Sequence, residues 1–223
     1  ITAVSASDDL NDTVSSDESI ELSTSDNSDV VSEEVLTSNS HTVTPTTYKN
    51  YFENGVLIST SVNEGDTLNI DGVFSNKTFS FKKQVNVVGS STNVLKNCIF
   101  MFYNGASGST ISNLNINNSE DYKCGVFLNG ASNCVISGCT IKNNGMSSYA
   151  IGIGNNANHN NVTDNKLTTF GITYGHGTRS APPLVISGSH YNYIANNKII
   201  CDDANGIYLS SYPGGYFNGG HSN

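Results

Sequence analysis

The chain has 223 residues, with 19 acidic and 10 basic side chains, 21 Gly, no Trp and a formal net charge of -9. It contains no run of 18 apolar residues, which argues against a transmembrane segment in this chain, and its wealth of Asn, Ser and Gly argues against a helix bundle. A negative chain with a single arginine, Arg179, is also a poor match for a nucleic-acid partner, because it repels phosphate.

The acidic side chains are concentrated at the N-terminal end. Residues 1–45 hold ten carboxylates and no Lys, Arg or aromatic residue. Such a segment cannot bury enough apolar surface to offset the conformational entropy that folding removes. We therefore predict a disordered, acidic, Ser/Thr-rich tail over residues 1–47, followed by a folded domain over residues 48–223.

Several features are typical of an exported chain. The small residues Val4 and Ala6 resemble the end of a secretory signal peptide, so we expect a remnant of a signal, a longer precursor and a secreted, cell-surface location. Four N-glycosylation sequons agree with export, at Asn11, Asn76, Asn117 and Asn161. The five cysteines lack metal-ligand spacing and predict buried free thiols, at Cys98, Cys124, Cys134, Cys139 and Cys201.

From residue 65 onward the chain repeats itself. A six-residue pattern begins and ends with an apolar residue and carries Asn, Cys or Leu at its fourth position. Its copies lie at residues 111–116, 136–141, 162–167 and 194–199. A second apolar run precedes each of the last three copies, and a further run follows the fourth, at residues 125–128, 150–153, 184–187 and 206–209.

Short apolar runs bounded by Gly and Asn are typical of strands. Three strands in each unit, joined by Asn or Gly in left-handed conformation, would wind the chain into rungs about 4.8 Å apart. We therefore predict an all-β fold, a parallel β-helix (solenoid); the alternative is an antiparallel sandwich. One inward column should join the rungs through buried side chains, formed by Cys98, Leu114, Cys139, Asn165 and Asn197.

The repeat region also resembles a known family. The tracts 65–89 and 94–100, with Asn133-Cys-Val-Ile-Ser-Gly-Cys-Thr-Ile141, are similar to the right-handed parallel β-helix domain of adhesin-like surface proteins from methanogenic archaea. Those proteins resemble pectate lyases in fold. The resemblance covers about residues 50–223 and implies a right-handed β-helix, without fixing an activity, because this architecture hosts lyases, hydrolases and adhesins.

Histidine recurs near the ends of successive units. The triplets His159-Asn-Asn161, His190-Tyr-Asn192 and His221-Ser-Asn223 are 31 residues apart, so the chain stops where a further strand should begin. We expect more rungs or a cap in the full-length protein, because an open β-helix end has unpaired backbone groups. A row of histidines could bind a transition metal; solvent-facing turn histidines are the alternative, and we predict no metal site.

A polysaccharide lyase of this fold would need carboxylates to hold calcium and a base to remove a proton. The candidates are His176 and Arg179, in the insertion 173–183, with Asp202 and Asp203 one rung later. We predict no cofactor, and calcium is the alternative that a lyase would require. The structural alternative is a solvated Asp202-Asp203 turn that pairs with Arg179 across rungs.

Aromatic residues lie in or beside the variable loops that follow the six-residue pattern. Exposed aromatic rings offer contact area to sugars or proteins at low entropic cost. The residues that we predict to bind a ligand are Tyr122, Tyr149, Phe170, Tyr174, His176 and Arg179. Three further tyrosines lie near the C-terminal end, at Tyr208, Tyr212 and Tyr216. Some of these rings could instead cover the rim of the coil.

Taken together, these features favour a non-catalytic, adhesin-like surface protein that binds glycans or a partner cell. The alternatives are a polysaccharide lyase or glycoside hydrolase, and a structural stalk. Release of unsaturated or reducing sugars would identify an enzyme, and a glycan array would separate an adhesin from a stalk.

Overall fold

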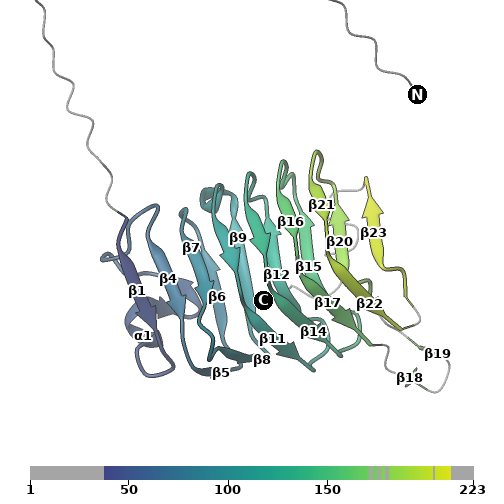
Figure 1. The fold of residues 1–223 in the computed structure, drawn as a ribbon, viewed down its shortest axis with the longest axis horizontal. Coiled ribbons are helices and arrows are strands. Elements are labelled where there is room, and N and C mark those ends of the chain that lie inside the picture. The colour runs from purple at the N-terminus through teal and green to yellow at the C-terminus, as the bar shows by residue number, and fades with distance from the viewer. Residues whose placement is uncertain (1–37, 171–172, 175–176, 179–180, 203, 212–223) are drawn as a thin grey trace, which may run out of the picture. The chain divides into compact units, whose positions relative to one another are not determined.

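The computed structural model describes residues 38–170, 173–174, 177–178, 181–202 and 204–211. This part of the chain is a parallel β-solenoid, in which three sheets run along a stack of turns (Figure 1). Successive strands pair in parallel within each sheet, apart from a short hairpin at the start of one of them. The predicted all-β solenoid is confirmed, and the parallel pairing excludes the antiparallel sandwich.

Each complete turn gives one strand to sheet A, then one to sheet C, then one to sheet B. Sheet A contains β1 (Ser40–Val43), β4 (Thr67–Ile70), β7 (Asn86–Gly89), β10 (Thr110–Ser112), β13 (Val135–Ser137), β16 (Asn161–Thr163) and β21 (Tyr193–Ala195). Sheet C contains β5 (Val73–Ser75), β8 (Val94–Lys96), β11 (Asn115–Asn118), β14 (Thr140–Asn143), β17 (Lys166–Thr169) and β22 (Lys198–Cys201).

Sheet B holds the longest strands. It contains β2 (Phe52–Glu53), β3 (Val56–Leu57), β6 (Thr78–Phe81), β9 (Ile99–Tyr103), β12 (Cys124–Asn129), β15 (Tyr149–Gly154), β20 (Leu184–Ser187) and β23 (Ile207–Ser210). A separate antiparallel pair joins β18 (Thr173–Tyr174) and β19 (Gly177–Thr178), and the described helices are α1 (Tyr48–Tyr51) and the 3-10 turn η1 (Asn104–Ala106). Neither helix is long and apolar enough to cross a membrane.

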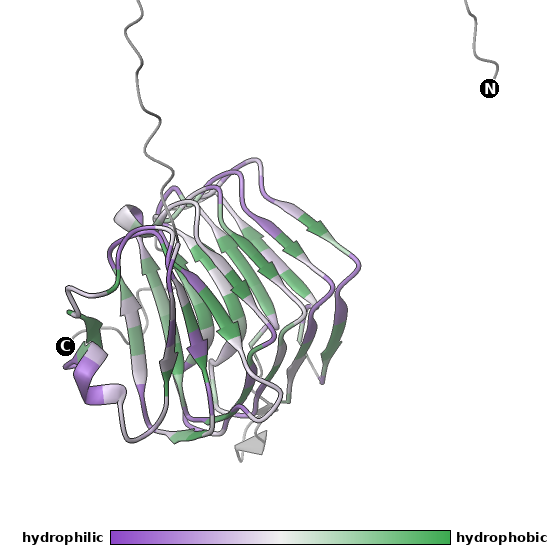
Figure 2. Ribbon diagram, turned by 60° about the vertical axis from the view of Figure 1, so that its left-hand side comes forward, coloured by the Kyte–Doolittle hydropathy of each residue, from purple (hydrophilic) through white to green (hydrophobic). Residues whose placement is uncertain are grey.

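The register explains the six-residue pattern. Its first apolar residue lies in sheet A, where Ile111, Ile136, Val162 and Ile194 are successive partners, and its last lies in sheet C, where Ile116, Ile141, Leu167 and Ile199 are partners. Both point inward, so like residues stack on like. The second apolar run of each unit forms a strand of sheet B, and apolar and polar residues alternate along many of the strands (Figure 2).

The core is aromatic at one end and aliphatic at the other. Phe79 stacks on Phe100 and Phe81 on Phe102, with ring centroids 4.4 and 4.6 Å apart. Tyr48 of α1 and Phe52 of β2 pack against the ring of Phe79 at the N-terminal end. Later turns are filled by Ile, Leu and Val, so the internal section stays full although the residue type changes.

Polar side chains join the turns at two corners of the coil. At the corner before sheet C, the amides of Asn165 and Asn197 accept hydrogen bonds from the backbone N–H groups one turn earlier, at 2.9 and 3.0 Å. At the corner before sheet A, Asn160 and Asn192 do the same, at 2.7 and 2.9 Å. These buried N–H groups lie at corners between strands, outside the hydrogen-bonded ladders, so each needs a side-chain acceptor and each amide helps to fix the register of its neighbour.

The predicted inward column is correct in four of its five members. The register places Asn93, rather than Cys98, below Leu114. Segment 94–100 runs from sheet C into sheet B, so Cys98 lies at the next corner, where its N–H donates to Asn118. The prediction was wrong at Cys98 because similar short apolar runs flank two different corners.

The coil begins before the predicted boundary at residue 48. Strand β1 lies within residues 38–47, which we assigned to the tail, and pairs with β4 over its whole length. Its predecessor Asn39 donates its N–H to the buried carboxylate of Asp66. The acidic segment 1–37, with Asn11, lies outside the described residues, as do His221 and the end of the chain from residue 212.

Candidate functional site

The residues predicted for catalysis fall largely in parts that the structure does not describe. His176, Arg179 and Asp203 lie outside the described residues, and for Tyr174 only the strand β18 is given. Asp202 is exposed directly after β22, and its N–H donates to the carbonyl of Thr169. The catalytic constellation therefore stays a prediction.

The predicted aromatic residues divide between surface and interior. Tyr122 and Phe170 are 45% and 39% exposed, and both lie at the corner between sheets C and B. Tyr149, in contrast, begins β15 and is only 4% exposed, packed in a small cluster with Cys124 and Phe127. Its ring is thus not available to a ligand on the surface. We expected Tyr149 in or beside a loop, but it is the first residue of a strand of sheet B.

Tyr208, Tyr212 and Tyr216 were expected near the C-terminal end. Tyr208 is partly buried against the same cluster as Tyr149, and the other two lie outside the described residues.

Two exposed aromatic residues that the sequence analysis did not select form a platform on the corner before sheet A. Tyr191 and Tyr193 are 79% and 61% exposed. The ring of Tyr191 stacks on the imidazole of His159, with centroids 5.0 Å apart and planes 9° apart, and the ring of His190 is tilted by 59° to it at 6.3 Å. We call His159, His190, Tyr191 and Tyr193 the aromatic platform.

The histidine repeat is therefore not a histidine stack. The register pairs Asn161 with Tyr193, which sets Tyr191, two residues earlier, opposite His159. His190 lies one position too early to face His159, because the turns are 32 rather than 31 residues apart at this corner. Within the described ranges no group of three or more His, Cys, Asp or Glu could hold a metal ion.

The backbone of the aromatic platform has an unusual conformation. His159 and Tyr191 both have φ of 57°, in the left-handed region. The equivalent corner position holds Gly65, Gly108 and Asn133 in earlier turns, residues that tolerate this region, and Gln84, without a positive φ, in the turn of β7. A bulky side chain there costs about 1 kcal/mol or more, and such strain is common at binding sites.

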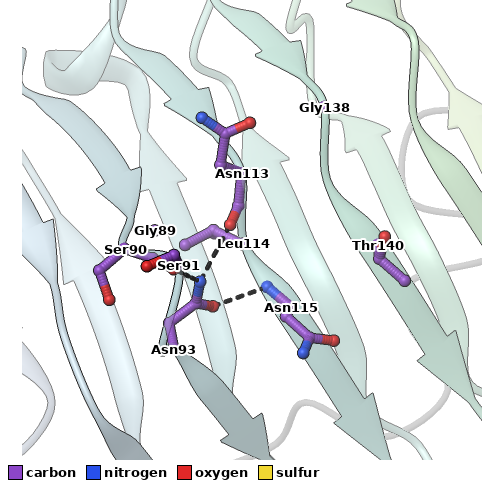
Figure 3. Close-up of a pocket in the computed structure, with 9 residues that line it drawn as sticks. All are labelled: Gly89, Ser90, Ser91, Asn93, Asn113, Leu114, Asn115, Gly138 and Thr140. Carbon is purple, nitrogen blue, oxygen red and sulfur yellow. Dashed lines mark hydrogen bonds between the residues drawn. The ribbon is translucent and has the colours of Figure 1, made fainter.

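A polar groove lies at the other corner of sheet A, where the chain enters sheet C (Figure 3). It has a volume of about 540 Å³ and is lined by Gly89, Ser90, Ser91, Asn93, Asn113, Leu114, Asn115, Gly138 and Thr140. The amide of Asn93 holds the groove wall, since it accepts from the N–H of Asn115 at 2.8 Å and donates to the carbonyl of Asn113 at 3.1 Å. The groove thus offers uncharged donors and acceptors.

The outer faces of the three sheets differ in charge. Within the described residues, the strands of sheets A and B contain no Asp, Lys or Arg, and a single Glu, Glu53 of β2. The strands of sheet C carry four exposed lysines, Lys96, Lys142, Lys166 and Lys198. We call these four residues the lysine strip.

The lysine strip forms no ion pair within the described part of the chain. The ion pairs found there join His41 to Asp66 at 2.9 Å and Lys123 to Glu120 at 3.5 Å, and none involves the strip. The ammonium of Lys142 lies 5.2 Å from the ring centroid of Phe170, within the range of a cation–π contact. Four cations therefore face solvent in a chain whose net charge is negative.

The cysteines are structural. All five are unpaired; four are buried and Cys201 is half-buried, which confirms the predicted free thiols for this set. Burial raises the pKa of the Cys139 thiol to about 11 and that of Cys124 to about 12. Both remain protonated at neutral pH and are poor nucleophiles.

Comparison with known proteins adds no assignment. No family model, no curated protein and no solved structure matches the chain. The aromatic platform, the groove and the lysine strip are consequently the features from which a function has to be argued.

Proposed function

We propose that the chain is a non-catalytic, adhesin-like β-helix of the cell surface that binds glycans on a partner. The observation that supports this is the aromatic platform, where rings stand at strained backbone positions and face solvent. With this backbone conformation, Gly or Asn would be less strained at these positions, as at Gly65, Gly108 and Asn133. Retaining His and Tyr there indicates a use for the rings themselves.

The platform has the chemistry that sugar recognition requires. The flat, exposed face of Tyr191 can cover the apolar C–H face of a pyranose, and the neighbouring Tyr193 hydroxyl can bond its hydroxyl groups. The side chain of Asn161, exposed on the strand beside Tyr193, offers a further donor and acceptor. Stacking of Tyr191 on His159 holds the ring in one orientation, which lowers the entropic cost of binding.

The test uses a substitution that separates binding from folding. Tyr191→Asn removes the ring but suits the left-handed backbone, so the free energy of unfolding should rise by up to about 1 kcal/mol. Binding on a glycan array should nevertheless fall about tenfold or more, while Tyr191→Phe should retain binding. Unchanged binding by Tyr191→Asn would contradict the platform as the site.

A second aromatic residue provides the comparison. Tyr122 also has φ of 57° and is exposed, but it lies at the corner between sheets C and B. Tyr122→Asn relieves the same kind of backbone strain at that corner. If this variant loses binding and Tyr191→Asn does not, the binding site lies at the corner between sheets C and B. Release of reducing or unsaturated sugars from any array polysaccharide would instead establish an enzyme.

A further inference from the structure

We propose that the outer face of sheet C is a second binding surface, and that the lysine strip takes an acidic polysaccharide. The ligand class, a glycan, rests on the proposed function; the surface, the residues and the anionic character go beyond it. The aromatic platform contributes nothing to this surface, since it lies at the opposite side of sheet A from the corner that enters sheet C.

The register arranges the strip in two columns. Lys96 and Lys142 are both partners of Asn117, so they lie two turns apart in one column, or about 10 Å at the usual strand spacing. Lys166 and Lys198 are direct partners in the other column, about 5 Å apart. An extended polymer along the solenoid axis would meet a cation at every one or two turns.

A bound anion would stabilise the pair Lys166 and Lys198. Like charges directly opposite one another on neighbouring strands destabilise a sheet, and no carboxylate of the described residues lies within ion-pair distance of either. An earlier turn of the same column shows that an uncharged residue fits this position, since Thr140 is the direct partner of Lys166 in the register. An anionic group between the two ammonium groups would convert repulsion into attraction.

The neighbours of the strip suit sugar hydroxyl groups. Asn115 and Thr140 belong to the same column as Lys166 and Lys198, and both also line the polar groove. The column therefore leads from uncharged hydrogen-bonding groups in the groove to two cations (Figure 3 shows the groove end). Beside Lys142, the exposed ring of Phe170 adds an apolar contact.

This composition favours an acidic polysaccharide over other polyanions. Duplex nucleic acid presents a much denser charge than four lysines in two columns can match. Lysines act as point charges without the planar fork of arginine, so they suit anionic groups that are spread along a flexible polymer. Amide and hydroxyl side chains between them can bond neutral parts of each sugar.

A matched pair of polymers tests the anionic character. Carboxymethyl-dextran and unmodified dextran share a backbone and differ in their carboxylates. The full chain should bind the carboxylated polymer, measured by calorimetry or affinity electrophoresis, at least about tenfold more tightly than dextran at about 50 mM salt, and should lose most of that preference at about 200 mM.

Matched variants test the residues. Lys166→Gln combined with Lys198→Gln should weaken binding of the carboxylated polymer about tenfold. Lys49→Gln combined with Lys82→Gln changes the net charge equally, at exposed positions of α1 and the loop after β6, and should change binding less than about twofold. Thermal unfolding of both double variants shows whether either effect comes from misfolding.

Four outcomes would overturn the inference. Equal binding of both dextrans, equal losses in the two double variants, or no binding of the carboxylated polymer would each exclude a cationic site on sheet C. Duplex DNA bound as tightly, with the same dependence on Lys166 and Lys198, would show a general polyanion surface instead. Glycan-array binding that depends on Tyr191 would survive all four outcomes, so the proposed function can stand when this inference fails.

Discussion

The first and the last turns of the solenoid have the same register but are stabilised by different chemistry. The N-terminal turns are filled by phenylalanines and closed by α1 and the β2–β3 hairpin. In the last described turn, Ile207 and Leu209 of β23 are 43% and 70% exposed, and the amides of Asn192 and Asn197 supply the links to the preceding turn. Burial therefore dominates at one end and directional hydrogen bonding gains in importance toward the other.

This difference shows what a stacked fold requires from its sequence. A turn is stable when its inward side chains fill the section and its buried N–H groups find acceptors. Phenylalanine meets the first need in early turns, and Asp66 and Asn93 meet the second there. In late turns the second need is met by asparagines that also bond one another, such as Asn165 and Asn197. Substitutions should consequently have effects that depend on the turn as well as on the residue type.

The largest effect is expected in the aromatic end. Phe100 is fully buried and stacked on Phe79, so Phe100→Ala should lower the free energy of unfolding by about 3–5 kcal/mol through the cavity it leaves. Ile151→Val, one methylene smaller in the aliphatic turns, should cost about 0.5–1.5 kcal/mol. Urea denaturation measures both free energies of unfolding. Equal losses would contradict the proposed difference between the aromatic and the aliphatic turns.

The asparagine links provide the second test. Asn165→Ala removes the acceptor of the Cys139 N–H and the donor to the Ile136 carbonyl, and should cost about 2–3 kcal/mol. Amide exchange at Cys139 should accelerate at the same time. Asn115→Ala, at an exposed site on the outer face of sheet C, should stay within about 0.5 kcal/mol of the parent protein, and a similar loss there would contradict a special role for the buried amide.

A smaller effect, visible in acid, is expected at Asp66. This residue occupies the corner position that Asn160 and Asn192 hold later, and N–H groups of Asn63 and Asn39 and the His41 ring bond its carboxylate. These bonds lower the pKa of Asp66 from 3.8 to about 2. The charged form is thus stabilised by folding, so its contribution is complete above pH about 4 and is lost as the pH falls toward about 2.

Replacement of Asp66 tests the direction of this pH dependence. Asp66→Asn should cost about 1–2 kcal/mol at neutral pH, because the amide has one acceptor oxygen for several donors, and the cost should shrink between pH about 4 and about 2. Denaturation across this range measures both. A cost that is constant with pH would assign the effect to packing instead of charge.

The repeat was readable from the sequence because each turn carries its apolar residues in the same register. Segments 111–116 and 136–141 predicted the stack and its inward fourth position correctly. Cys98 and Tyr149 were misplaced because a short apolar run does not say which of the three sheets it enters.

The surface features could be identified only once the register of the strands was known. Lys166 and Lys198 occupy the same fifth position of the six-residue pattern, and this signal was present in the sequence. The platform was harder to find, because the stack of Tyr191 on His159 depends on the 32-residue offset between the turns, whereas the histidine triplets suggest 31.

One corner of the coil tolerates changes in length. Five residues connect β11 to β12 and β14 to β15, but fourteen connect β17 to β20, counting residues 119–123, 144–148 and 170–183. The strands on both sides keep their parallel partners. Closing the longer loop costs only about 1 kcal/mol more. Loops at this corner can therefore change in length while the strands keep their pairing. New recognition segments can be inserted here without altering the neighbouring turns.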